Sequence, residues 1–203
     1  MAFLRAHPGF LAERPELYRA LDPPTRVHGE RLADHMAAML SAERTYAGAM
    51  AERADGVLAA GRATAGMALR VQEAVLALLR GDSVADCIAG VFPALLAIDA
   101  ASLCIEDRPG VAPVPGVRPL PAGRVVALVG HRAVVFRSQG EDAPMLHGEA
   151  ARLARHDVLL RLPGDGPPAL VALASRELAP LDPAQGAGPL GFLARAVAAA
   201  LGR

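Results

Sequence analysis

The sequence predicts an α+β domain, in which helices flank an antiparallel sheet, preceded by a long helical arm. Three observations predict this layout. No proline occurs between Pro24 and Pro93, and apolar residues recur there at helical spacing. After Asp99 the pattern changes to short apolar runs, which are typical of strands. Asp182-Pro183 then supplies an N-cap followed by a first-turn proline, so a closing helix is expected there.

Residues 1–66 are predicted to form the arm and residues 67–203 the domain. Short helices broken by prolines are expected over residues 3–22, and one long helix over residues 29–79, with a kink near 61–66. One side of that helix follows the 4-3 spacing of a coiled-coil seam at Leu32, Met36, Met39, Tyr46, Met50 and Val57. A thin apolar stripe needs a partner, so a homodimer is predicted. Packing of the arm against its own domain is the alternative.

The first half of the domain is expected to hold one helix, two strands and a loop-rich middle. The helix over residues 84–97 follows an N-cap at Asp82 or Ser83 and turns four apolar residues inward, Ile88, Val91, Phe92 and Leu95. Strands are predicted at 101–106 and 133–137. A loop rich in proline and glycine, with one short strand at most, is expected over 107–123.

The second half of the domain holds the clearest hairpin signal. A short helix is expected near 146–154, followed by strands at 157–162 and 169–174 around a turn of Pro, Gly and Asp. The closing helix turns one face inward, at Leu190, Leu193, Ala194, Val197 and Leu201. This order of elements fits the GAF/PAS-like class of small sensory domains.

Composition excludes several classes of protein. The 203 residues carry 21 basic and 21 acidic groups, so a nucleic-acid binder that relies on bulk positive charge is disfavoured. Two cysteines are too few for a disulfide scaffold. The N-terminus lacks the apolar run of a signal peptide. The most apolar long window, residues 84–105, is interrupted by Asp86, Pro93 and Asp99, so no transmembrane span is predicted. Because Cys87 and Cys104 are the only thiols, a cytoplasmic location is expected.

Ser175 and Arg176, at the predicted end of the second hairpin strand, are the first candidates for ligand binding. The ends of central strands often face ligands, and a guanidinium can hold a carboxylate or phosphate through two parallel hydrogen bonds. A bracing role is the alternative, in which Arg176 pairs with an acidic neighbour, Glu177, Asp182 or Asp157.

Two further arginines and two histidines complete the candidate ligand-binding set. Arg118 and Arg137, with Arg161, are expected to be mostly exposed. His147 and His156 are either solvated loop histidines or partners in one pocket. No histidine has metal-ligand spacing and no cysteine pair supports zinc, so no metal site is predicted and any cofactor is unknown. Cys87 and Cys104 have apolar neighbours and are expected in the core.

Four segments resemble the family called domain of unknown function 484. Residues 3–11 look like its F-L-x-x-H-P-x-F-L start, and residues 72–79 are similar to the opening of its globular part. Residues 172–176 resemble its A-L-G-S-R strand end, and residues 182–195 its P-x-Q-G-T-x-x-L-x-F-L-A-R closing helix. Three positions depart from the family pattern: Ala174 for glycine, Ala187 for threonine, and Thr64 where asparagine is common.

The resemblance implies a helical arm and a GAF-like domain in cytosolic proteobacterial proteins, with no assigned activity. GAF domains typically bind small molecules or act as dimeric signalling modules, although a fold does not fix a function. We therefore expect a non-enzymatic, homodimeric module that senses a ligand. One alternative is a ligand-free adaptor for a partner protein, which the lack of a cavity between the sheet and residues 107–156 would favour. The other is an enzyme that depends on Cys or His.

Overall fold

The computed structural model describes residues 2–8, 10, 31–107, 110, 112 and 114–202. The chain divides into two compact units, Met1–Leu58 and Ala59–Arg203, and each is described by itself. Most of the short helices expected over residues 3–22 lie outside the described residues, and α1 covers Ala2–Ala6. Across the described part of the chain, no helix combines the length and apolar character that a bilayer span requires.

Helix α2 covers Arg31–Arg80 and follows the proline-free stretch of the sequence. It continues through Gly61 and Gly66 as one helix, because the surrounding alanines offset the roughly 1 kcal/mol that each glycine costs. The predicted domain boundary after residue 66 therefore falls within a continuous helix, and it stays a prediction. In the unit Ala59–Arg203, the last turns of α2 bury one apolar stripe, Met67, Val71, Ala74 and Leu78.

The helix expected over residues 84–97 is three short pieces. They are α3 (Val84–Asp86), the π-helix η2 (Cys87–Val91) and α4 (Phe92–Leu96). Ser83 caps the first, because its Oγ accepts a hydrogen bond from the N–H of Asp86 at 3.2 Å. The wider π turn shifts the register of the inward face. Val91 is consequently exposed, contrary to the prediction, and Leu96 is buried.

Five strands form one mixed sheet in the order β2-β1-β5-β4-β3. Their bounds are β1 Ala100–Glu106, β2 Val117–Leu120, β3 Val134–Ser138, β4 His156–Leu162 and β5 Ala169–Ser175. Three of the four pairings are antiparallel, and the predicted hairpin of β4 and β5 is present. The prediction of an antiparallel sheet is wrong for one pairing, at the β2 edge. There β2 runs parallel to β1, with Leu103 opposite Val117 and Glu106 opposite Leu120.

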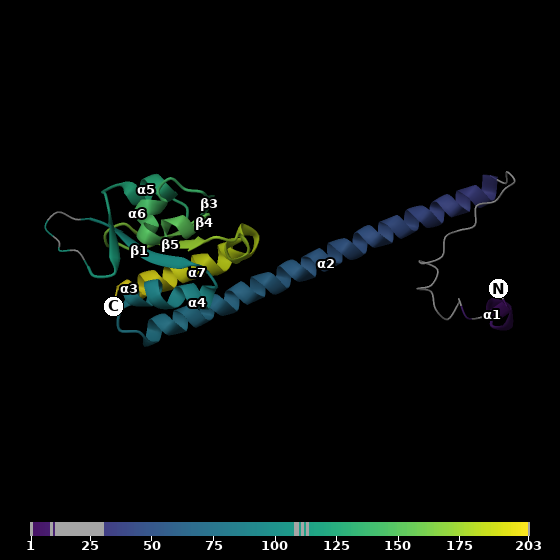
Figure 1. Cartoon of the computed structure of the whole chain (residues 1–203), viewed down its shortest axis with the longest axis horizontal. Coiled ribbons are helices and arrows are strands. Elements are labelled where there is room, and N and C mark those ends of the chain that lie inside the picture. Colours follow the sequence, from purple (N-terminus) through teal and green to yellow (C-terminus); the bar gives the residue numbers. More distant parts are fainter. Residues whose placement is uncertain are drawn as a thin grey trace. The chain divides into compact units, whose positions relative to one another are not determined.

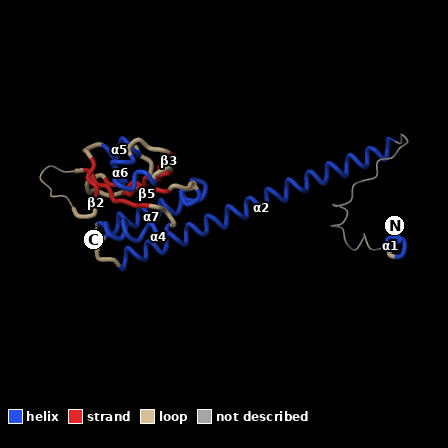
Figure 2. The backbone as a smooth tube through the Cα atoms, viewed as in Figure 1, coloured by secondary structure: helices blue, strands red, loops and turns tan. Residues whose placement is uncertain are grey.

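Helices cover both faces of the sheet, as Figures 1 and 2 show. One face, here called the α7 face, packs on the end of α2, on η2 and α4, and on α7 (Pro183–Leu201). The other, here called the α5/α6 face, packs on α5 (Arg124–Val129) and α6 (Ala143–His147). Successive residues of each strand alternate between the two faces, so Leu103 packs with the first group and Cys104 with the second.

The remaining helices differ from the sequence prediction in detail. The expected short helix near 146–154 is α6 followed by the 3-10 helix η3 (Gly148–Leu153), while α5 was not predicted. A second 3-10 helix, η4 (Ala179–Leu181), precedes α7. Asp182 caps α7 by accepting from the N–H of Ala184 at 2.9 Å, as predicted. The inward face of α7 is also as predicted, except that Leu201 in the last turn is exposed.

Candidate ligand-binding site

Helix α6 is anchored to the sheet through the carbonyl oxygen of Leu146. The hydroxyl of Ser102 on β1 donates to that oxygen at 2.6 Å, and the thiol of Cys104 lies 3.8 Å from it. Ser102 and Cys104 are both buried, and they are two residues apart on one strand, so their side chains share the α5/α6 face. This contact fixes the end of α6, and therefore the next residue, His147, against β1.

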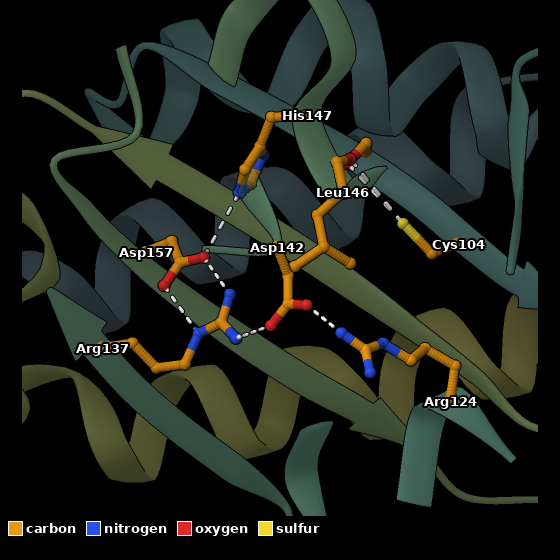
Figure 3. A network of polar contacts seen from close by, with 8 residues as sticks. Cys104, Arg124, Arg137, Asp142, Leu146, His147 and Asp157 are labelled. Atoms are coloured by element: carbon orange, nitrogen blue, oxygen red, sulfur yellow. Dashed lines mark hydrogen bonds and ion pairs between the residues drawn. The ribbon is translucent and has the colours of Figure 1, made fainter. Parts of the chain in front are cut away.

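A chain of charged side chains crosses the same face. Arg137 on β3 donates from Nε to Oδ1 of Asp157 at 2.9 Å and from Nη2 to Oδ2 at 2.5 Å. It also donates from Nη1 to Asp142 at 3.3 Å, and Asp142 in turn accepts from Arg124. Figure 3 shows the Arg137 guanidinium between the two carboxylates, with His147 at the other side of Asp157. This network of charged side chains connects β3, β4, α5 and the start of α6.

Asp157 stays ionised in spite of its burial. Burial by itself raises the pKa of this carboxyl group. Hydrogen bonds from His147 and Arg137, together with the positive charge of Arg137, outweigh that effect and hold the pKa of Asp157 below its ordinary value. The side chain of Arg137 is only 17% exposed, so the prediction of a mostly exposed arginine is wrong here. The pairing with a buried carboxylate explains the difference, because a lone buried charge is strongly disfavoured.

His147 is fully buried, so the interpretation as a solvated loop histidine is wrong for it. Its Nε2 lies 3.5 Å from Oδ2 of Asp157, and a carboxylate can only accept, so Nε2 carries the proton. Nδ1 is also buried and has no hydrogen-bond partner in the part of the chain that the structure describes. His147 ends α6, and Gly148 follows it with φ +55°, a conformation that favours glycine.

His156 is not brought together with His147. It is half-buried at the start of β4, where its Nδ1 and the hydroxyl of Ser138 are hydrogen-bonded at 3.2 Å. His156 directly precedes Asp157, and successive strand residues point to opposite faces of a sheet. The ring of His156 therefore lies on the side away from the one that contacts His147. The alternative of one pocket shared by both histidines therefore does not match the described structure.

Arg118 on β2 lies beside the α6–η3 turn and is half-buried rather than exposed as predicted. Its Nη2 donates to the carbonyl oxygen of His147 at 3.2 Å. A Cβ placed on Gly148 would overlap the Arg118 guanidinium, so a side chain at this position would have to displace that group from the turn. Among the described residues, no carboxylate forms an ion pair with Arg118. Glu149 also lines this edge of the sheet, but it forms no ion pair with Arg118 in the described structure.

An open cavity of about 680 Å³ lies beside Arg118 and is here called the β1-edge cavity. Because β2 pairs only from Leu103 onward, the first three residues of β1 have no β2 partner, and the cavity occupies that edge. Its lining comes from four segments: Ala100, Ala101 and Ser102; Gly116, Val117, Arg118 and Pro119; His147, Gly148, Glu149 and Ala150; and Ala89. The volume falls in the range of small-molecule sites.

The first candidates, Ser175 and Arg176, lie elsewhere and have structural partners. Arg176 donates from its backbone N–H to Oδ2 of Asp99 at 2.8 Å and from Nε to Oδ1 at 2.9 Å. None of the three predicted acidic partners holds it, since Asp99, 77 residues earlier, is the carboxylate that comes close. Ser175 is buried and accepts from the N–H of Glu177 at 3.1 Å. Neither residue lines the β1-edge cavity.

The two cysteines are buried, as predicted, and both thiols are free. Burial raises the pKa of Cys104 to about 11, and it also raises the pKa of Cys87. The reactive thiolate is disfavoured at both positions. No group of three or more His, Cys, Asp or Glu side chains with metal-binding geometry occurs among the described residues.

Sequence reasoning missed Asp142, Arg124 and Ser102 as members of the site. One signal was available for Ser102, which is a hydroxyl residue inside an otherwise apolar predicted strand. Asp157, considered only as a partner of Arg176, is likewise an acid that opens a strongly apolar strand. A polar group in such a strand must be hydrogen-bonded when buried, which marks it as a candidate for a specific contact.

The fold and cavity define an α+β protein, in which a five-stranded mixed sheet carries an open, arginine-lined cavity at one edge and a long helix precedes the sheet. A family model described as protein of unknown function, DUF484, matches residues 1–203. The chain therefore belongs to the DUF484 family, as its four motifs indicated. A search of curated proteins found no match.

Proposed function

We propose that the chain is a cytosolic, non-enzymatic regulatory module with a GAF-like domain, which binds a small molecule in the β1-edge cavity and dimerises through α2. The observation that carries the proposal is the cavity itself. It combines the unpaired guanidinium of Arg118, the buried hydroxyl of Ser102 and the unpaired edge of β1. A few convergent polar groups in an otherwise apolar pocket are typical of ligand sites.

The lining of the cavity is also connected, through η2 and α3, to the end of α2. Ala89, in the π-helix η2, is part of its lining, and neighbouring η2 residues pack in one core cluster with Val71 and Leu78 at the end of α2. Gly116 at the cavity wall lies against α3, since a Cβ there would come within 3.2 Å of the Ala85 side chain. A ligand that favours one arrangement of η2 and α3 would bias the end of α2, provided that it binds two arrangements with different affinities.

The seam on α2 supports the dimer. The seam residues with described side chains are all exposed in the single chain: Met39, Tyr46, Met50 and Val57, with Tyr46 62% and Val57 72% exposed. The side chains of Leu32 and Met36 lie outside the description. Large apolar side chains repeated along one side of a long helix are stabilised when a second helix covers them. A second copy of the chain offers an identical seam.

The two alternatives are less well supported. For a ligand-free adaptor we expected no cavity between the sheet and residues 107–156, whereas the β1-edge cavity occupies that position. For a thiol-dependent enzyme, the raised pKa of Cys104 leaves little thiolate near neutral pH. His147 is fully buried and directed at Asp157, which suits a structural group better than an exposed general base.

Native mass spectrometry of the full chain purified from its source cells tests the proposal. We expect a non-covalent small-molecule adduct on the wild-type protein. Arg118→Gln, which removes the unpaired charge, and Ala150→Phe, which fills the cavity, should both lose it. Arg152→Gln is the matched control, because Arg152 lies on η3 but does not line the cavity. Absence of any adduct on the wild-type chain would favour the adaptor.

A further inference from the structure

A second and larger cavity lies at the opposite end of the sheet strands, where β4 turns into β5. Its volume is about 810 Å³, and it is here called the turn cavity. The Pro/Gly-rich turn over residues 163–168 forms one wall, and the last turns of α7 form another. It shares no lining residue with the β1-edge cavity. The two cavities are therefore separate places in the fold.

Small side chains on α7 create the space. Gly191, Ala194 and Ala198 follow one another at helical spacing and line the cavity, so no side chain larger than a methyl group projects from these three positions. The surrounding walls are apolar, with contributions from Ile105, Leu162, Ala169 and Leu201. Leu201, which the sequence predicted to be a core residue, is instead part of this partly exposed wall. An apolar body can therefore be accommodated here.

Two unpaired guanidinium groups line the same cavity. Arg161 on β4 donates from Nη1 to the carbonyl oxygen of Gly130 at 3.2 Å, and Arg195 on α7 lies with its guanidinium carbon 5.9 Å from the centre of the Phe192 ring. Neither arginine forms an ion pair with a carboxylate in the described chain. Asp165 and His131 also line the cavity, and both are exposed. With two arginines against one carboxylate, the lining carries net positive charge.

We infer that the turn cavity binds an organic anion, in which a carboxylate or phosphate group is attached to an apolar body. The arginines of the lining, Arg161 and Arg195, offer planar donors that match these oxyanions. The apolar body lies over the small residues of α7. Nothing in this inference depends on occupancy of the β1-edge cavity.

Calorimetric titration of the full chain with three probes tests the inference. Octanoate and octyl phosphate carry the two candidate anionic groups, and octan-1-ol carries the same apolar chain without charge. We expect one molecule of at least one anion per chain, with the alcohol about tenfold weaker or more, since charge-assisted hydrogen bonds contribute roughly 1.5–3 kcal/mol. Inorganic phosphate alone should bind more weakly than octyl phosphate, because it lacks the apolar body. Octan-1-ol binding as tightly as both anions would overturn the inference.

Two pairs of variants locate the site. The double variant Arg161→Gln/Arg195→Gln should weaken anion binding about tenfold or more, whereas Arg132→Gln, an exposed arginine outside the lining, should not. Ala198→Leu should weaken binding by filling the cavity, whereas Ala199→Leu, on the exposed side of α7, should not. Circular dichroism melting confirms that each variant is folded. No anion binding up to millimolar concentration, or unchanged binding in both test variants, would contradict the inference.

Discussion

Arg137 and Asp157 occupy directly paired positions of β3 and β4 and are joined by two hydrogen bonds, at 2.9 and 2.5 Å. Both side chains lie largely out of solvent, so each neutralises a charge that would otherwise be costly to bury. The same Asp157 oxygen that receives Nη2 of Arg137 also faces Nε2 of His147. This pair therefore positions His147, and through it the wall of the β1-edge cavity.

Replacing Arg137 should be much more destabilising than replacing Arg176. Arg137→Met leaves Asp157 buried without its main partner, which costs about 3 kcal/mol in the free energy of unfolding. Arg176→Met removes an ion pair whose arginine side chain is 63% exposed, and such pairs contribute under about 1 kcal/mol. Urea denaturation of both variants measures the difference. Equal losses in the free energy of unfolding would show that the Arg137–Asp157 pair stabilises the fold no more than the Arg176–Asp99 pair does.

The lowered pKa of Asp157 predicts how stability depends on pH. A carboxyl group whose pKa is lower in the folded state stabilises the fold above its unfolded pKa, about 3.9, and loses that contribution as pH falls through the folded value. Asp157→Asn cannot ionise. We expect the wild-type advantage over this variant to be largest near pH 7 and to shrink below about pH 4.

Chemical denaturation of both proteins from pH 7 to pH 3 measures this advantage. Asp99 is the control, because the backbone N–H of Arg176 and then its guanidinium also lower the pKa of that carboxyl group, although burial opposes them. The stability advantage of the wild type over Asp99→Asn should also shrink as pH falls, but by a smaller amount, because the Arg176 side chain is mostly exposed. A wild-type advantage over Asp157→Asn that is constant across this range would contradict the account.

Cys104 should be nearly inert in the folded protein. With a pKa of about 11, roughly one molecule in a thousand carries the thiolate at pH 8. Alkylation by iodoacetamide should therefore be at least about a hundredfold slower in the native state than after unfolding. Peptide mass spectrometry of quenched samples measures both cysteines. Rapid native labelling of Cys104 would restore the thiol-enzyme alternative.

The seam on α2 predicts the oligomeric state. Light scattering should give about twice the chain mass of 21.0 kDa for the wild type. Tyr46→Glu/Val57→Glu places charges in the seam and should give a monomer, as should deletion of residues 1–62. Ser41→Glu is the control, because it lies two residues after Met39 and therefore roughly 200° round the helix. A monomeric wild-type chain would rule out dimerisation through the arm.

Local patterns predicted the elements with strong sequence signals. The hairpin of β4 and β5 followed from two apolar runs around a Gly/Pro/Asp turn, and α7 followed from Asp182-Pro183. Helix α5 was missed, since its sequence Arg-Val-Val-Ala-Leu-Val favours strand by its β-branched residues. The helix forms because both carboxylate oxygens of Glu106 accept backbone N–H groups of its first turn, at Gly123 and Val125. That contact spans 17–19 residues and leaves no local signal.

The candidate site was predictable only in part. His147, Arg118 and Arg137 were among the named candidates, and the structure places all three on the α5/α6 side of the sheet. Their burial was not foreseen, because it depends on Asp157 and on the turn at Gly148. The preference for Arg176 was misplaced for a similar reason. Its partner Asp99 directly precedes β1, and the antiparallel pairing of β1 with β5 brings it beside the end of β5. Register between distant strands is not visible in a single sequence.

Hydrogen exchange most directly tests whether occupancy of the β1-edge cavity is coupled to α2. The chain purified from its source cells is compared with the same chain emptied in denaturant and refolded. We predict slower amide exchange in the occupied protein at the cavity lining, in η2, and in the buried turns of α2 around Val71 and Leu78. Protection confined to the lining, with α2 unchanged, would contradict the account of this chain as a ligand-sensing module.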